Sequence, residues 1–273
     1  MKKISASSDC TSSFGHYRLR GTKKMLFNLA QKLPQNTFGF KTALVLRKLT
    51  LQNKVRIVDE TQLGFRLRLY PLDNLGDRFL LFMPKFYEHN EFQLMAQVLR
   101  PDSVFIDIGG NMGIYSFMAA KFITEKGRIL SFEPNPIMLD RFKFNRAIND
   151  LDGRIAIEPV GVADKESSFT LSLPNKNMGG ASIIVEHGED HLQIRCRPLL
   201  DVLREHHITH IDLLKIDIEK ADAIALKPFL EKAPQELFPK IIFIESDEDI
   251  DLAAFGYKFI SRSKSLNSVY RLE

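Results

Sequence analysis

The stretch from residue 104 to residue 116 constrains the fold of this chain more than any other. Val104 to Ile108 is a short apolar run containing Asp107, and residues 109–113 then supply three glycines in five positions. Apolar residues resume at helical spacing from Ile114, so the stretch predicts a strand, a tight turn and a helix. Glycine tolerates a positive φ and lets a ligand approach the backbone closely. The start of a helix adds free N–H groups and a positive dipole end. The sequence therefore predicts a ligand site at this turn.

The spacing of the glycines distinguishes between ligands. A dinucleotide-binding turn requires the pattern G-x-G-x-x-G, but Asn111 and Ile114 occupy its third and sixth places. A strand ending in an acid, then G-x-(G/N)-x-G, then a second strand ending in an acid, is the pattern of S-adenosylmethionine-dependent methyltransferases. The second acid is Glu133, 24 residues after Gly109, where a carboxylate can bind both ribose hydroxyl groups. The cofactor-binding residues predicted from this stretch are Asp107, Gly109, Gly110, Asn111, Gly113 and Glu133.

Length and charge suggest how the chain is divided. With 273 residues, of which 44% are hydrophobic, it can bury a full α/β core. We expect a disordered Ser-rich arm over residues 1–20, a small α+β extension over 21–84 and the catalytic domain over 85–273. Residues 1–68 carry 14 basic and 3 acidic residues, a net charge of +11, against −7 for the rest. This basic part would be a solvated arm, a contact with an anionic membrane, or a contact with a charged acceptor.

Cysteines and apolar runs bear on the compartment. Cys10 and Cys196 are too few and too far apart for a disulfide framework or a zinc site, so we expect free thiols and a cytoplasmic protein. No apolar run approaches the ~18 residues of a spanning helix, and no run near the start suits a signal peptide. Residues 22–33 form a basic amphipathic pattern that would allow peripheral contact with a membrane. Packing on the catalytic domain is the preferred use of its apolar residues Met25, Leu26, Leu29 and Leu33.

Alternating elements predict a doubly wound, mostly parallel seven-stranded sheet of the Rossmann-like class. After the strand at 104–108, strand patterns occur at 128–133, 155–160, 211–219 and 240–244, with helical patterns at 88–99 and 135–149. A hairpin at 257–260 and 268–272 would close the sheet. The extension predicts a helix at 41–51, strands at 54–58 and 63–69, and a turn at 73–77.

Two further segments are expected at the rim of the ligand site. Residues 161–164 occupy the turn where an adenine ring would lie, so Asp164 would accept a hydrogen bond from its amino group. An ordinary turn aspartate is the alternative. Residues 169–173 and 193–197 alternate like a hairpin around the loop 174–191, a candidate lid with Gly179 and Gly180 as its hinge.

Asp217 and Glu219 end the buried run that begins at Ile211. Strand side chains alternate, so the two acids point to one side, at the sheet edge where ligands bind. We expect like-charge repulsion and burial to raise the pKa of at least one of them. Asp217 would position cofactor and acceptor, and Glu219 would take the proton. The alternative for either acid is to cap the next helix.

In order and spacing, these motifs resemble the FkbM family of S-adenosylmethionine-dependent methyltransferases. The resemblance covers residues 85–260 and rests on residues 105–113, 132–136, 215–219, 242–245 and 256–257. It implies that Gly109, Asn111, Gly113 and Glu133 bind S-adenosyl-L-methionine and that Asp217 and Glu219 face the acceptor. Members are mostly O-methyltransferases of sugars, glycans or polyketide-type small molecules. The chain departs from the family at Gly110, where alanine is usual, and at Lys220 and Asp222, where Glu-Gly-x-Glu would continue.

Other patterns argue against a metal ion and against nucleic acid. His187 with His191, and His206 with His210, are spaced four apart but lack further ligands at zinc spacing. The 21 phenylalanines are scattered at core spacing and Trp is absent, so no stacking platform for nucleic acid is expected. The alternatives to a methyltransferase are an NAD-dependent oxidoreductase and a scaffold that keeps the fold without turnover. The oligomeric state is open.

Overall fold

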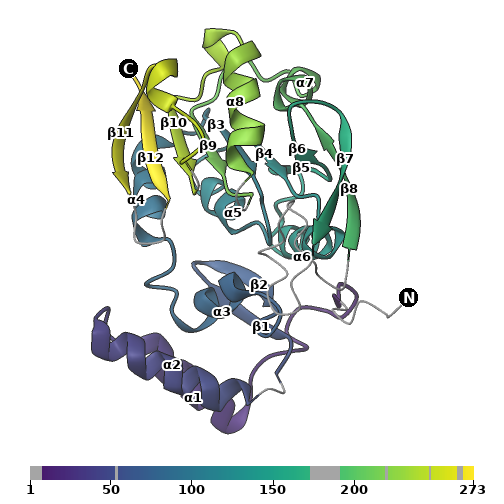
Figure 1. Ribbon diagram of the computed structural model, residues 1–273. Helices are drawn as coiled ribbons and strands as arrows, with labels where there is room; N and C mark the ends of the chain where they lie inside the picture. The colour runs from purple at the N-terminus through teal and green to yellow at the C-terminus, as the bar shows by residue number, and fades with distance from the viewer. Residues whose placement is uncertain (1–7, 53–54, 173–190, 219–220, 246, 263–266) are drawn as a thin grey trace.

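The computed structural model describes residues 8–52, 55–172, 191–218, 221–245, 247–262 and 267–273, and a seven-stranded sheet forms its centre (Figure 1). The strand order is β11-β12-β10-β9-β3-β4-β5. The bounds are β3 Val104–Ile108, β4 Arg128–Phe132, β5 Ala156–Glu158, β9 Leu213–Ile216, β10 Ile241–Ile244, β11 Tyr257–Arg262 and β12 Ser268–Leu272. Strands β10 to β5 run parallel, whereas β12 is antiparallel to both β10 and β11. The predicted mostly parallel seven-stranded sheet is confirmed.

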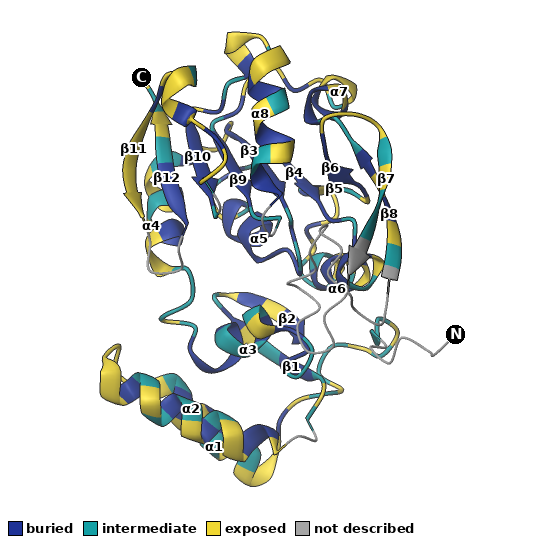
Figure 2. Cartoon of the chain, in the orientation of Figure 1, coloured by how far each residue is buried: buried dark blue, intermediate teal, exposed yellow. Residues whose placement is uncertain are grey.

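Helices cover both faces of the sheet, because its side chains alternate between two cores. Ile106 of β3 packs in one core with α7 (Leu199–Glu205) and α8 (Asp222–Lys232). Phe105 packs in the other with α5 (Ile114–Ala119) and α6 (Pro136–Ala147), and α4 (His89–Val98) joins this side. All five residues of β3 are buried, as a central parallel strand requires. Figure 2 shows the central strands β3, β9 and β10 as buried, whereas the edge strand β11 is mostly exposed.

A small second sheet stands beside the main one, in the order β6-β8-β7. Its strands are β6 Gly161–Val162, β7 Ser167–Ser172 and β8 His191–Arg197, and β7 and β8 pair antiparallel as predicted. Residues 161–162 were expected in a turn but pair with β8, so that prediction was wrong there. The candidate lid falls almost entirely on residues 173–190, outside the described residues.

The extension is a helical hairpin, a two-stranded sheet and a short helix. The hairpin is α1 Gly21–Lys32 and α2 Thr37–Leu51, and then follow β1 Val58–Gln62, β2 Phe65–Leu69 and α3 Leu75–Phe82. Two predictions need correction: the first strand begins at Val58 instead of residue 54, and the expected turn at 73–77 is the start of α3. Asn74 starts α3 because its side-chain oxygen accepts a hydrogen bond from the Gly76 N–H group at 2.9 Å.

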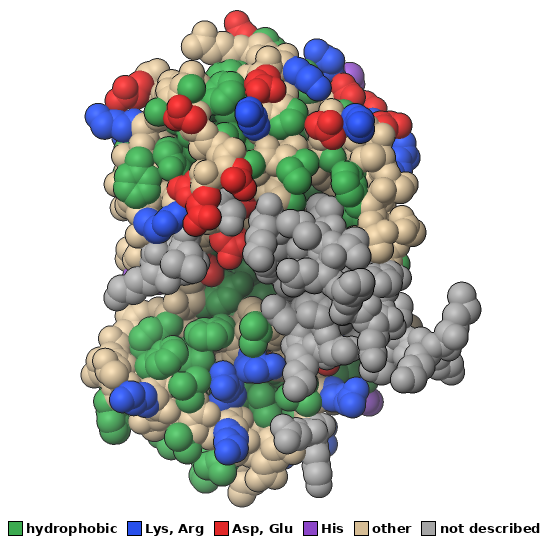
Figure 3. Space-filling view, viewed as in Figure 1, with side chains coloured by type: hydrophobic (Ala, Val, Ile, Leu, Met, Phe, Trp, Pro, Cys, Tyr) green, Lys and Arg blue, Asp and Glu red, His purple; other side chains and the backbone are tan. Residues whose placement is uncertain are grey.

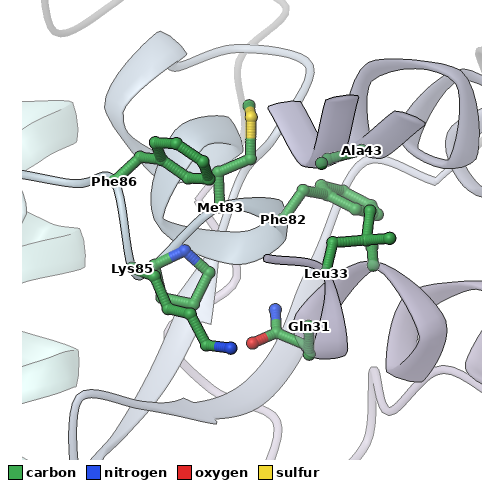
Figure 4. Close-up of a pocket in the computed structure, with 10 residues that line it drawn as sticks. Gln31, Leu33, Ala43, Phe82, Met83, Lys85 and Phe86 are labelled. Atoms are coloured by element: carbon green, nitrogen blue, oxygen red, sulfur yellow. The ribbon is translucent and has the colours of Figure 1, made fainter. Parts of the chain in front are cut away.

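Apolar side chains join the hairpin to the end of α3. Figure 4 shows Leu33 and Ala43 of the hairpin around Phe82, beside a small cavity. The cavity volume is about 10 Å³, room for about one water molecule and no ligand. Leu26 and Leu33 pack against buried residues, but α1 meets α2 and α3 of the extension where the catalytic domain was predicted. Met25 and Leu29 are exposed, so the packing prediction was wrong for these two.

A buried arginine, together with Asp59 and Tyr70, connects the extension to the first described residues. Arg68 of β2 pairs with Asp59 through two hydrogen bonds, of 2.8 and 2.9 Å, and donates to the carbonyl groups of Asp9, Ser12 and Ser13. Its backbone N–H donates to Asn145 of α6 at 2.8 Å. The structure therefore gives residues 8–20 a defined path, where composition predicted disorder. Among the described residues, no helix combines the length and apolar character needed to cross a membrane.

Candidate active site

The glycine turn after β3 is shaped by close contacts with its neighbours. Gly109 has a φ of 84°, and a Cβ atom there would lie 2.1 Å from the Asp217 carbonyl oxygen. Gly113 has a φ of 93°, and its Cβ would overlap the Phe142 ring. A Cβ at Gly110 would lie 2.2 Å from the Ser131 hydroxyl oxygen. Glycine is therefore required at all three positions, and the family's usual alanine at 110 would not fit this packing.

Glu133 closes the turn from the end of β4. One carboxylate oxygen accepts the Asn111 N–H group at 2.7 Å and the other accepts the Asn135 N–H group at 2.8 Å. Burial raises the pKa of Glu133 to about 8, although both N–H groups act in the opposite direction. Asn111 itself has a φ of 52°, in the left-handed region. The predicted neighbours Glu133 and Asn111 are thus in direct contact.

Asp107 lies at the bottom of the site, between β4 and β9. One of its carboxylate oxygens accepts a hydrogen bond from the Ser116 hydroxyl group at 2.7 Å. The other, Oδ1, is buried and has no hydrogen-bond partner among the described residues. Burial raises the pKa of Asp107, while Lys215 and Ser116 act against that shift. A buried acceptor without a partner is costly, so Oδ1 suits a ligand that brings a donor.

Lys215 brings a buried cation into the site, which the sequence analysis overlooked. It is the register partner of Asp107 on β9, and its ammonium lies 3.0 Å from an Asp217 carboxylate oxygen and 4.7 Å from the centre of the Tyr115 ring. Burial alone would lower the pKa of Lys215, but Asp217 and Asp107 hold it above the ordinary value. A lysine two residues before Asp217, in an otherwise apolar strand, was the available signal, because alternation puts both on one side.

The two predicted acids follow β9, which ends at Ile216 instead of residue 219, and the structure describes only the first of them. Asp217 is partly buried: burial opposes its charge, but Lys215 outweighs burial and holds the pKa of Asp217 below its ordinary value. We expected a raised pKa for at least one of the two acids; Asp217 does not show it, and for Glu219 it stays a prediction. Glu219 and Lys220 lie outside the described residues. Asp222 is buried and accepts the Ile218 N–H group at 2.9 Å, so it stabilises the start of α8.

Side chains from the first third of the chain complete the site. Asn74 donates from its side-chain nitrogen to the Asn111 side-chain oxygen at 2.9 Å. The Tyr115 hydroxyl group donates to Glu88 at 3.0 Å, next to the Lys215 contact. Neither Asn74 nor Glu88 was predicted, because their partners are distant in the sequence. The extension is thus part of the wall of the site.

The remaining residues singled out in the sequence are Asp164, whose adenine contact stays a prediction, and the histidines, of which His187 lies outside the described residues. Asp164 is exposed after β6, and among the described residues no hydrogen bond joins it to the turn. His206 pairs with Glu158 at 2.7 Å and His210 with Asp212 at 3.4 Å. The described part of the chain holds no group of three His, Cys, Asp or Glu side chains suited to a metal ion.

The site opens toward an acidic surface. Figure 3 shows acidic side chains gathered at the upper rim of a hollow between the sheet and the extension, whereas basic side chains lie among hydrophobic ones below it. Asp217, which follows β9, and Glu245, which follows β10, lie at this sheet edge. Carboxylates around a hollow favour a cationic ligand.

Comparison of the sequence with known proteins identifies one protein family. The model of the methyltransferase FkbM domain matches residues 107–262, more than half of the chain. Methyltransferase sdnD of Sordaria araneosa is 26% identical, with 46% of this chain and 61% of that protein covered. AMB antimetabolite synthetase AmbE of Pseudomonas aeruginosa is 25% identical, with 46% of this chain and 8% of that protein covered. The chain therefore spans under two thirds of one relative and a small part of the other.

Solved structures of two methyltransferases match the chain at low identity. The methyltransferase FkbM of Methylobacillus flagellatus KT has a TM-score of 0.44 and 18% identity, and the match covers 73% of this chain and 55% of that one. The tRNA (uracil-54, C5)-methyltransferase of Pyrococcus abyssi, in complex with S-adenosyl-L-homocysteine, has a TM-score of 0.45 and 11% identity, covering 79% and 43%.

Proposed function

Because the chain belongs to the FkbM methyltransferase family, we propose that it transfers a methyl group from S-adenosyl-L-methionine to a hydroxyl group. The acceptor would be a sugar, a glycan or a polyketide-like small molecule. The observation that supports this proposal best is the turn at 109–113, with Glu133 bound to the Asn111 N–H group and the unpartnered Oδ1 atom of Asp107 beneath it.

The residues of the turn fit the cofactor. The Glu133 carboxylate has acceptor capacity left for ribose hydroxyl groups, since each of its oxygens accepts one backbone N–H group. Oδ1 of Asp107 would accept from the ammonium group of the methionine part. The absence of a side chain at Gly109 keeps the turn open on the side of Asp217.

The protein must align the acceptor and receive its proton. S-adenosylmethionine supplies a methyl group activated on a sulfonium, so no further activation of that group is needed. When the acceptor oxygen bonds to the methyl carbon, the bond between that carbon and the sulfonium sulfur would break and S-adenosyl-L-homocysteine would leave. The hydroxyl proton would pass to a carboxylate. Lys215 keeps Asp217 ionised, which suits positioning of the acceptor, and Glu219 is the proposed base.

A binding experiment tests the cofactor. Replacing Glu133 by Ala is expected to weaken S-adenosylmethionine binding by about 1.5 to 3 kcal/mol, because hydrogen bonds to a charged group are lost. Isothermal calorimetry measures this, with Glu231→Ala on the exposed side of α8 as the matched control. Equal affinity in both variants contradicts the ribose assignment. Tight NAD binding by the wild type would instead support the oxidoreductase alternative.

A turnover experiment tests the chemistry. With a panel of hydroxylated acceptors and methyl-labelled cofactor, Asp217→Asn and Glu219→Gln are each expected to lower kcat by roughly 100-fold or more. Cofactor affinity should stay within a few-fold. Full activity in both variants would show that another group or solvent takes the proton. Cofactor binding with no turnover on any acceptor would support the scaffold alternative.

A further inference from the structure

The helical hairpin exposes an apolar surface that the fold does not cover. It consists of two stripes of exposed side chains. On α1 these are Met25 (65% exposed) and Leu29 (51%), and on α2 they are Phe38 (70%), Val45 (58%) and Leu49 (46%). We call this surface the hairpin face. Figure 2 shows the hairpin at one end of the molecule with exposed residues along both helices. Scattered exposed apolar side chains are ordinary on a protein surface, whereas groups of them mark interaction sites. Five large apolar side chains exposed on one hairpin therefore indicate an interaction site.

The spacing shows that the hairpin face lies away from the packed side of each helix. On α1 the buried residues are Phe27 and Ala30, and Met25 and Leu29 lie about half a turn away from Phe27. On α2 the buried side runs through residues 39, 43, 46 and 50, and positions 38, 45 and 49 lie away from it. Both helices pack on α3 with their buried sides. Each helix is therefore amphipathic, with its second apolar stripe pointing outward.

The charge of the hairpin is of one sign. Residues 21–51 contain six lysines and arginines and no aspartate or glutamate. Lys24 is engaged with Glu60 of β1, but Lys32, Lys41 and Lys48 are exposed and have no acidic partner among the described residues. Figure 3 shows the result, basic side chains placed among hydrophobic ones on the lower part of the molecule.

We propose that the hairpin face docks on an anionic lipid bilayer. Its apolar stripes would enter the boundary between headgroups and acyl chains, and Lys32, Lys41 and Lys48 would contact lipid phosphates. A second copy of the chain fits less well, since two faces of the same positive sign repel. The extension contacts the glycine turn through Asn74 and Asn111, so docking would hold the site on the side of the sheet that faces the membrane-bound hairpin (Figure 1).

Vesicle sedimentation tests this proposal with the full chain. Vesicles of phosphatidylcholine with about 30% phosphatidylglycerol should sediment the protein, and pure phosphatidylcholine vesicles should do so at least about tenfold less well. Binding should fall steeply when salt rises from about 50 mM to about 500 mM, because the Debye length shortens. No association with the anionic vesicles at low salt overturns the proposal.

A matched pair of substitutions distinguishes vesicle binding through the hairpin face from nonspecific hydrophobic adsorption. Phe38→Glu on α2 should weaken vesicle binding at least about tenfold. Phe259→Glu, on β11 in the other part of the molecule, makes the same chemical change at a residue 52% exposed and should leave binding unchanged. Equal binding by the two variants overturns the proposal. So does light scattering that shows a wild-type dimer broken by Phe38→Glu, since a second copy would then cover the face.

Discussion

Lys215 is the residue that gives the catalytic site its electrostatic character. It is buried in a strand whose other three residues are apolar, and its ammonium contacts Asp217 at 3.0 Å and the Tyr115 ring. A buried cation between two carboxylates stabilises their ionised forms and is itself stabilised by them. Asp217 is therefore available as an anion over a wider pH range than an isolated buried carboxyl group.

Removing this cation should change the pH dependence of turnover. Asp217 acts as an anion, and Lys215 lowers its pKa, so activity persists as pH falls. In Lys215→Met the pKa of Asp217 should rise, and the acid limb of the kcat profile should move up by roughly one pH unit or more.

Lys258→Met is the control, since Lys258 also pairs with a carboxylate, Glu273 at 3.3 Å, but on the surface. Its acid limb should match the wild type. Lys215→Arg, which keeps the charge, should restore much of the original profile. An unchanged limb in a folded Lys215→Met protein would contradict the role given to Lys215; thermal melting establishes whether the variant is folded.

The pKa of Glu133 predicts how cofactor binding depends on pH. Ribose hydroxyl groups donate to the ionised carboxylate, and burial raises the pKa of Glu133 to about 8 in the free protein. The binding-competent form is therefore lost as pH falls below 8, and affinity should drop roughly 25-fold between pH 8.5 and 6.5. Calorimetry across this range measures the drop. Glu133→Gln, which cannot ionise, reports the titration of the cofactor itself, and identical pH profiles for the two proteins would contradict the prediction.

At the scale of elements, the start of α3 supports the glycine turn. Asn74 caps α3 through its side-chain oxygen and holds Asn111 through its side-chain nitrogen. Asn111 sits in the left-handed region, a conformation that non-glycine residues adopt at some cost. One side chain thus couples a helix of the extension to the turn that is proposed to bind the cofactor.

Asn74→Ala should therefore lower both stability and cofactor affinity. Loss of the cap costs about 1 kcal/mol, and release of Asn111 should weaken S-adenosylmethionine binding several-fold. Asn36→Ala is the matched control, because Asn36 caps α2 by accepting the Gly39 N–H group at 2.8 Å and does not contact Asn111. Chemical denaturation should show a loss in both variants, while calorimetry should show weaker binding in Asn74→Ala alone. Equal affinities would mean that Asn74 serves only the helix.

At the scale of the whole molecule, Arg68 holds the extension against the first described residues of the chain. All five N–H groups of its side chain have acceptors, two on Asp59 and three backbone carbonyl groups of residues 9, 12 and 13. The Arg68 and Asp59 side chains are almost completely buried. A buried pair that loses one partner leaves a charge without compensation, which is more costly than losing a surface pair.

Arg68→Met should lower the free energy of unfolding by about 3 to 5 kcal/mol. Arg66→Met, two residues earlier on the same strand, removes a surface pair with Asp150 and should cost less than about 1 kcal/mol. Urea denaturation of both variants measures the difference. Similar small losses would show that the carbonyl groups of residues 9–13 and the Asp59 carboxylate find water when Arg68 is absent.

The sequence by itself determined the central sheet and the turn after its first strand. Apolar runs that end in Asp107, Glu133 and Asp217, and the glycines between 109 and 113, specify strands and a turn through backbone geometry alone. Because the carboxyl ends of parallel strands meet at one edge, their acids could be placed together before any contact was known. The spacing of these motifs also indicated the family, which the domain match confirms.

Only the tertiary structure decided which groups surround that turn. The contact between Asn74 and Asn111 joins residues 37 positions apart, and no local periodicity encodes such a pair. The lowered pKa of Asp217 depends on the exclusion of water around Lys215, a property of the packed core. Exposure of Met25 depends likewise on which side of α1 the rest of the protein covers. Local geometry sets the elements, whereas burial and charge pairing arise only when distant segments pack together.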